Sequence, residues 1–264
     1  MNDNFTSLVF FTVLCQTAVG ALIFRALMLL KGWHDLATFD FGRISLLAIA
    51  ILLFISLGFA FLHVGKPAHA LNALNNLGKS WLSRELLSFS LLIASLLVYF
   101  VLVMRGASEK TELIFSVISI PTGISLIYCM IRLYMIPSTS WYNPFTPVSF
   151  TITTFVCGIA MVAVISGKTY DGFSSTLSPL LAIFIISSLI NSILFSGSFF
   201  EQNLNLFIFR TVSSLLSLLI LAVIFFSANS NKTFILWVIL FIMVLSSEII
   251  NRFIFFLSFE KSGL

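Results

Sequence analysis

The chain has 264 residues, of which 59% are hydrophobic and only 9% are charged. A soluble domain carries about 25% charged residues, so a single water-facing core could not bury this much apolar surface. The net charge of +4 is thinly spread and contains no basic run, so we expect no nucleic-acid partner. Thirty phenylalanines without period-two alternation do not suit an outer-membrane barrel. We therefore predict an all-α, multi-pass integral membrane protein.

Eight apolar stretches are long enough, at about 20 residues, to cross a bilayer as helices. In chain order they cover roughly residues 5–30, 43–63, 85–104, 112–135, 148–167, 176–197, 204–227 and 233–257. An even number of spans predicts that both termini lie on one side of the membrane. Since no connection is long enough for a soluble domain, residues 1–264 are expected to form a single transmembrane domain of two packed four-helix bundles.

The first stretch exceeds signal-peptide length and lacks a basic start, so we expect a retained span. It contains two polar residues. Gln16, in the middle, is interpreted as a residue that packs against other helices. Arg25, near the end, is interpreted as extending its charge to the membrane surface.

The second span ends at His63, and the third begins with Glu85. One interpretation is that spans simply end in polar residues, with Glu85 stabilised by the helix dipole. The alternative is functional, because an imidazole and a carboxylate at the edge of hydrocarbon can deprotonate a lipid-soluble donor. The connection 64–84 has an apolar face and Pro67 just inside its start, which predicts a short helix lying in the interface.

The later spans carry a charged pair, Glu248 and Arg252, four residues apart and therefore on one helical face. Two interpretations stay open for them: a structural ion pair that locks the two bundles together, and a role in a proton path. Cys15, Cys129 and Cys157 are far apart in apolar segments and are expected to be small buried residues.

Haem and metal sites are not expected. The three histidines, His34, His63 and His69, lie at span ends or in loops, whereas bis-histidine ligation of haem needs histidines that face each other inside a bundle. A carboxylate cluster or cysteine pair for a metal centre is also missing from the sequence. We therefore predict neither haem nor a covalently bound cofactor.

Several short motifs, in their order along the sequence, resemble the anchor subunit of anaerobic dimethyl sulfoxide reductase, the DmsC family. One of them consists of His63-Val64-Gly65-Lys66-Pro67, then Leu74-Asn75 and Ser80-Trp81-Leu82-Ser83-Arg84-Glu85. The others are Phe11-Thr12-Val13 with Gln16, Arg132-Leu133-Tyr134, Trp141-Tyr142, Thr146-Pro147, and Glu248 with Arg252. Together they cover nearly the whole sequence.

The resemblance implies a subunit of the bacterial inner membrane that binds and oxidises menaquinol without being catalytic by itself. Electrons would pass to a ferredoxin-like iron–sulfur subunit and then to a molybdopterin catalytic subunit. His63 and Glu85 fall on family positions associated with the quinol site, within the motif that contains Gly65 and Pro67. His69 stands where the family commonly has arginine, which keeps a donor but loses the permanent charge.

Two other classes of protein remain open from the residues. A polytopic transporter would use Glu248 and Arg252 as substrate or proton sites, although transporters more often show matching broken helices in two repeats. A purely structural anchor would hold peripheral subunits while quinol reacts elsewhere.

Overall fold

The structure is a computed structural model that describes residues 3–30, 39–63, 74–136, 141–166, 172–195, 203–226 and 230–258. These ranges contain eight helices and no strand, and all eight are long and apolar enough to cross a membrane. The all-α prediction is thereby confirmed. The helices are α1 Asp3–Leu30, α2 Phe39–His63, α3 Trp81–Met104, α4 Glu109–Tyr134, α5 Phe145–Ser166, α6 Gly172–Phe195, α7 Leu204–Phe226 and α8 Ser230–Leu257.

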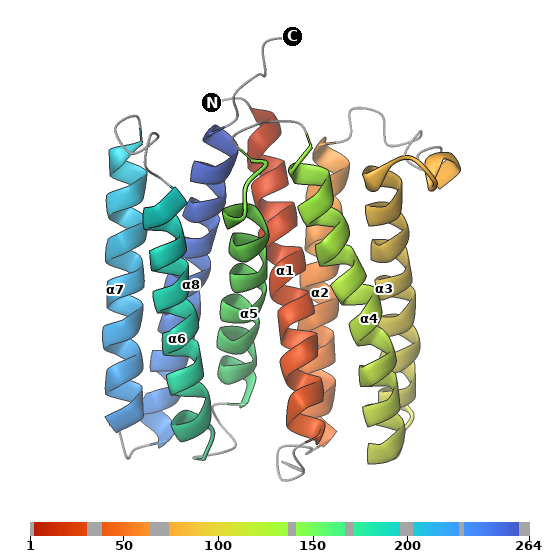
Figure 1. Ribbon diagram of the computed structural model, residues 1–264. Helices are drawn as coiled ribbons and strands as arrows, with labels where there is room; N and C mark the ends of the chain where they lie inside the picture. Colours follow the sequence, from red (N-terminus) through yellow and green to blue (C-terminus); the bar gives the residue numbers. More distant parts are fainter. Residues whose placement is uncertain are drawn as a thin grey trace.

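Successive helices run up and down, so that α1 begins and α8 ends at the same end of the molecule (Figure 1). We call this end the termini face, and the other end the opposite face. Helices α2, α4 and α6 end at the termini face, and α3, α5 and α7 begin there (Figure 1). The described helices therefore place both ends of the transmembrane domain on one side, as the even number of spans predicts.

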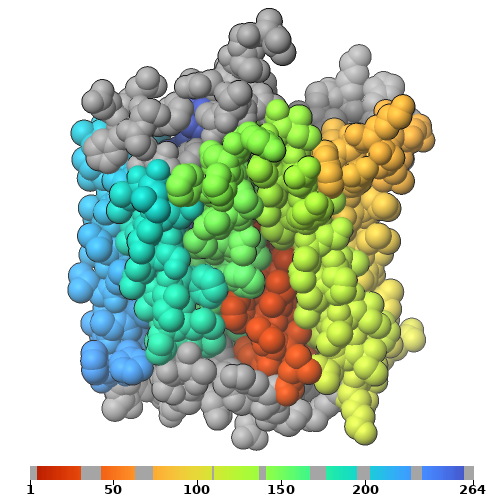
Figure 2. Space-filling model, in the orientation of Figure 1, coloured from red at the N-terminus to blue at the C-terminus, as the bar shows by residue number. Residues whose placement is uncertain are grey.

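The helices form two four-helix bundles. In the first, α1 packs on α2 and α4, and α3 packs on α2 and α4; in the second, α5, α6, α7 and α8 pack in the same cyclic order. The bundles meet mainly through α1 and α5. In the apolar 18-residue segments of α1 and α5, 83% and 67% of the residues are buried, whereas 28–39% are buried in the corresponding segments of the other six helices. In the space-filling view α1 (red) is visible only in a window beside α4 (Figure 2).

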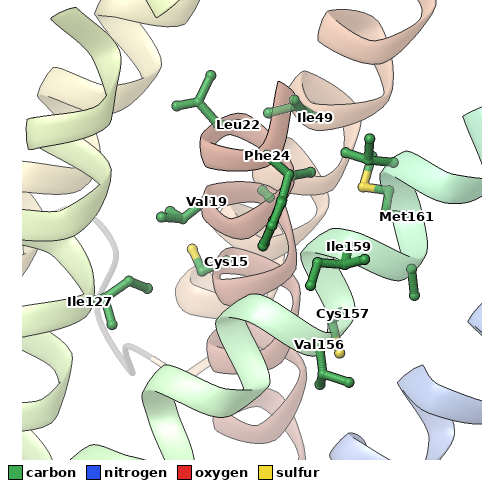
Figure 3. Packing of buried hydrophobic residues seen from close by; sticks show 14 of the residues in the cluster. Cys15, Val19, Leu22, Phe24, Ile49, Ile127, Val156, Cys157, Ile159 and Met161 are labelled. Carbon is green, nitrogen blue, oxygen red and sulfur yellow. The ribbon is translucent and has the colours of Figure 1, made fainter. Parts of the chain in front are cut away.

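Two glycines set the distance between the bundles. Gly20 on α1 and Gly158 on α5 face each other so closely that a Cβ on Gly158 would lie 2.6 Å from the Ala21 nitrogen. A Cβ on Gly20 would overlap the carbonyl oxygen of Thr154. Small residues allow such close approach of membrane helices, and the gain is close packing along their length. Figure 3 shows the apolar side chains of α1 and α5 around this crossing.

A buried arginine holds the first bundle together near the opposite face. Arg25 on α1 is 1% exposed and forms an ion pair with Glu112 on α4, with 2.9 Å between Nη2 and Oε2. Its other donors reach α2 and α3 through Ser45 and the Tyr99 hydroxyl, and Tyr99 bonds to Ser116 at 2.7 Å. The expectation that Arg25 extends to the membrane surface is therefore wrong. Its charge is satisfied inside the bundle because the other three helices all supply partners.

We expect Arg25→Met to destabilise the protein by about 3 kcal/mol, because breaking a buried ion pair leaves the partner charge uncompensated. The midpoint of thermal unfolding in detergent measures the loss. Lys110→Met is the matched control, since Lys110 is exposed on the same face of the membrane as Glu112. Equal midpoints for the two variants would show that the Arg25 cluster contributes nothing to stability.

Candidate functional site

The residues that the sequence groups into a site run from His63 to Glu85, and α2 ends and α3 begins at the termini face (Figure 1). His63 is the last residue of α2. The side chain of His63 and all of Gly65, Pro67 and His69 lie outside the described residues. The structure therefore bears on this site through Glu85 and its surroundings.

The described part of the α2–α3 connection is a tight turn. Residues 74–76 form one 3-10 turn, after which the Lys79 and Ser80 amides donate to the Asn76 carbonyl at 3.0 and 2.9 Å. The Arg84 guanidinium closes the turn by donating to the Leu77 and Gly78 carbonyls, both at 2.9 Å. The sequence predicts a short interfacial helix within 64–84; of this stretch, residues 74–80 form the 3-10 turn and its closing bonds, and residues 64–73 lie outside the described ones.

Helix α3 begins four residues before the apolar pattern predicts. The Ser80 hydroxyl caps the helix by accepting from the Ser83 amide at 3.4 Å, so Trp81 is the first helical residue. Glu85 is consequently one turn inside the helix and not at its mouth. One turn is about 5.4 Å, which moves the carboxylate away from the interface and into the bundle.

The Glu85 carboxylate is buried without a full set of partners. The residue is 4% exposed, and its Oε1 atom has no hydrogen-bond partner in the part of the protein that the structure describes. Burying a polar group without a hydrogen bond costs about 1–3 kcal/mol in proteins, and more for a charge. A buried acceptor without a partner on a membrane helix is a place where a ligand hydroxyl can bind.

Helices α1, α2 and α4 surround this carboxylate. Ser88, three residues after Glu85 on α3, shares a hydrogen bond with Ser125 of α4, with 2.9 Å between the hydroxyl oxygens. Cys15 bonds to the Ser56 hydroxyl of α2, with 3.3 Å between sulfur and oxygen. Phe11 of α1 packs on Phe89 of α3, with 6.1 Å between ring centroids. Glu85 therefore faces the interior of the first bundle at its termini end.

A cationic and aromatic rim lies beside the same helix start. The Arg84 guanidinium lies 4.4 Å and the Arg132 guanidinium 5.3 Å from the centroid of the Trp81 ring. Tyr128 meets Trp81 edge to face at 5.7 Å. A cation that lies over the face of an aromatic ring is attracted by the ring's electrons, which stabilises it in that position. Trp81 thereby holds the positive charges of Arg84 and Arg132 beside the start of α3.

An apolar groove of about 190 Å³ lies between α2 and α3. Its lining is formed entirely by aliphatic and aromatic side chains: Leu47, Ala50, Ile51, Leu53, Phe54, Ile93, Leu96, Leu97 and Phe100. Ile93 is eight residues from Glu85 along α3, which corresponds to about 12 Å of helix. The groove thus follows the same helix pair deeper into the hydrocarbon.

A second buried polar cluster lies in the other bundle. Glu248 of α8 accepts from Ser188 of α6 and from Thr153 of α5, both at 2.6 Å. Arg210 of α7 donates to the Ser188 hydroxyl at 2.8 Å. Arg252 donates to Gln16 of α1 at 2.9 Å and to Thr153 at 3.5 Å, and its guanidinium lies 3.6 Å from the Phe150 ring centroid.

This geometry refines the two interpretations of Glu248 and Arg252. The sequence suggests a direct ion pair, but the contact between them runs through the Thr153 hydroxyl. Arg252 does tie the bundles together, because its partner Gln16 belongs to α1. The packing interpretation of Gln16 agrees with this bond. Thr153, Ser188 and Arg210 belong to the cluster although the sequence alone does not single them out, because hydroxyls are frequent in membrane helices.

Within the described residues, no group of three histidine, cysteine, aspartate or glutamate side chains is placed to hold a metal ion. The three cysteines are free and buried. Fold and sites together define a polytopic membrane protein with ionisable groups buried in each of its two bundles.

The protein belongs to the family of DMSO reductase anchor subunits (DmsC), whose model matches residues 1–206. It is 30% identical over 182 residues to the C subunit of anaerobic dimethyl sulfoxide reductase from Escherichia coli (strain K12), a match that covers 67% of this protein and 63% of the relative. It is 28% identical over 196 residues to the YnfH subunit of an anaerobic dimethyl sulfoxide reductase from the same organism, covering 72% and 67%. The match to the corresponding C subunit of Haemophilus influenzae is 28% identical over 158 residues, covering 58% and 56%. The protein thus spans about three fifths of the length of these relatives.

Proposed function

We propose that this protein is the membrane anchor of a dimethyl sulfoxide reductase-type complex in the bacterial inner membrane, and that it binds and oxidises menaquinol. The observation that carries the proposal is the buried Glu85 carboxylate, whose Oε1 lacks a partner among the described residues. It lies on the helix that follows His63 and its motif. Membership of the anchor family supports the assignment to such a complex.

Oxidation of menaquinol to menaquinone releases two protons and two electrons. In this proposal His63 accepts a hydroxyl proton, since histidine titrates near neutral pH. Glu85 accepts a hydrogen bond from the other hydroxyl of the quinol and takes up the second proton, and both protons then pass to water. Gly65, Pro67 and His69 complete the head-group site from the same connection, with His69 donating where the family commonly has arginine.

The apolar groove between α2 and α3 suits the isoprenoid tail of the quinol. It is lined by apolar side chains, and its lining on α3 begins at Ile93, about 12 Å along the helix from Glu85. An isoprenoid tail placed there would bury apolar surface without leaving a polar group unpaired. The carboxylate and the groove are thus arranged as head and tail sites on one helix pair.

The electrons are proposed to pass to a ferredoxin-like iron–sulfur subunit, which supplies a molybdopterin catalytic subunit. Docking at the termini face would bring the acceptor close to the quinol, because α2 ends and α3 begins there (Figure 1). The fixed positive charges of Arg84 and Arg132 offer a complement to an acidic partner surface.

The test is steady-state oxidation of a reduced menaquinol analogue by the purified complex, in wild type and in His63→Ala. We expect the rate per assembled complex to fall by about 100-fold, which is at the low end for the loss of a general base. An unchanged rate in a fully assembled complex would remove His63 from the site. Purification without an iron–sulfur partner would contradict the assignment as an anchor.

A further inference from the structure

The buried cluster around Glu248 has more hydrogen-bond donors than acceptors. One carboxylate lies between two arginines, so the cluster carries an excess positive charge. Five of its buried donor atoms have no partner in the described part of the protein: Gln16 Nε2, Arg210 Nε and Nη1, and Arg252 Nε and Nη1. In a hydrocarbon environment such donors are costly unless another molecule satisfies them.

Two small cavities with mixed polar and apolar linings lie beside this cluster, and neither is lined by Gln16, Arg210 or Arg252. The inner cavity is lined by Glu248, by the hydroxyls of Ser188, Ser214, Ser217 and Ser247, and by the aliphatic side chains of Val156, Ile185 and Val244. The outer cavity is lined by Thr146, Ser149, Asn191, Ser192, Asn251 and two phenylalanines. Each measures about 10 Å³, which is about the room that one water molecule needs.

Helical spacing puts the two cavities in line. Asn251 follows Glu248 by three residues, and Thr153 follows Ser149 by four, so each pair lies on one helix face. Asn251 donates to the Ser149 hydroxyl at 3.3 Å, and Thr153 donates to Glu248 at 2.6 Å. Glu248 lies nine residues before the end of α8, which is about 14 Å below the termini face. The outer cavity lies between that face and the carboxylate.

Directly beyond the inner cavity, toward the opposite face, the second bundle has an apolar layer, and the next buried hydroxyl of α6, that of Ser178, lies ten residues or about 15 Å from Ser188. Ser217 on α7, Ile185 on α6 and Val244 on α8 line the inner cavity. One helical turn further toward the opposite face, these helices carry the buried leucines Leu221, Leu181 and Leu240. These leucines and the next interior residues, Ile224 and Trp237, are each at most 4% exposed. A layer of this kind offers water no hydrogen-bond partner. The two cavities therefore do not continue through this layer toward the opposite face.

We propose that the second bundle contains a dead-end water pocket that opens to the termini face and ends at Glu248. Water molecules in the two cavities satisfy the hydroxyls, the side-chain amides and Glu248, and give that carboxylate access to protons from one side only. The charged groups that face it are Arg210 from α7 and Arg252 from α8, while α1, α5 and α6 contribute Gln16, Thr153 and Ser188. The pocket belongs to the second bundle and stands whether or not the α2–α3 pair binds quinol.

Silver ions test this pocket, because Ag⁺ is small enough to follow water and blocks thiols. In the full-length protein with Cys15, Cys129 and Cys157 replaced by alanine, a single cysteine is introduced by Ser192→Cys at the outer cavity or Ser247→Cys at the inner one. Sealed membrane vesicles of each orientation are exposed to Ag⁺. The remaining thiol is then labelled with a maleimide after denaturation and counted by mass spectrometry.

We expect Ag⁺ added at the termini face to block both cysteines at least tenfold faster than a Leu240→Cys control, which lies in the apolar layer on the same helix as Ser247. From the opposite face all three should react slowly. Blocking of Ser247→Cys no faster than Leu240→Cys, or equally fast from both faces, would overturn the proposal. Ser217→Cys lines the same inner cavity and replaces Ser247→Cys if that variant does not fold.

Discussion

Glu85→Gln is expected to lower the rate of menaquinol oxidation per assembled complex by about 100-fold. The amide has nearly the same shape but cannot accept the hydroxyl proton, and a positioned general base typically contributes about 10²–10⁴-fold. Because the side chain is buried and Oε1 lacks a partner among the described residues, none of these residues is placed to replace it. The measurement is the steady-state rate over a range of quinol concentrations, in which we expect kcat to fall more than KM rises.

Glu112→Gln is the control for this result. It also removes a carboxyl charge from the first bundle, but a partly buried one near the opposite face, where Glu112 pairs with Arg25. We expect its rate per assembled complex to stay within about twofold of wild type, even if less complex assembles. A Glu85→Gln complex as active as the Glu112→Gln complex would exclude Glu85 from proton transfer.

Gly158→Leu is expected to prevent normal packing of the two bundles. Even a Cβ at this position would overlap the backbone of Gly20, and backbone cannot move aside as a flexible side group can. Overpacking of a tight contact costs about 1–3 kcal/mol and occasionally more, and leucine adds three further carbons. The yield of monodisperse protein in detergent and the midpoint of thermal unfolding should both fall sharply.

Gly58→Ala is the matched control, since a Cβ at Gly58 on α2 meets nothing within 4 Å. Alanine is favoured over glycine in a helix by up to about 1 kcal/mol, so this variant should be as stable as wild type or slightly more stable. If Gly158→Leu unfolds at the same temperature as Gly58→Ala, the close α1–α5 crossing does not exist in the folded protein.

The fold could be predicted from the sequence to a large extent, because the bilayer fixes both the length and the composition of each span. The hydropathy pattern places the start of α3 four residues late. Hydropathy identifies the apolar run but does not show that Ser80 caps the helix and brings Arg84 and Glu85 into it. That difference matters for function, since it changes Glu85 from an interfacial to a buried residue.

The partners of the buried charges could not be predicted, because they come from distant parts of the sequence. Arg25 and Glu112 are 87 residues apart and meet only when α1 packs on α4. For Glu248 and Arg252 the spacing of four correctly places both on one face, but hydroxyls from α5 and α6 take the carboxylate oxygens. A local pattern predicts which residues share a face and not which side chains from other helices reach them.

The most direct measurement is a single turnover, in which the anaerobic complex is mixed with one equivalent of reduced menaquinol analogue and reduction of the partner's iron–sulfur clusters is followed by electron paramagnetic resonance. The account predicts reduction in the wild type and reduction at least about 100-fold slower when His63→Ala and Glu85→Gln are combined. Dithionite should reduce the clusters equally in both complexes. Equal rates of reduction by quinol in the two complexes would contradict a quinol site at the α2–α3 pair.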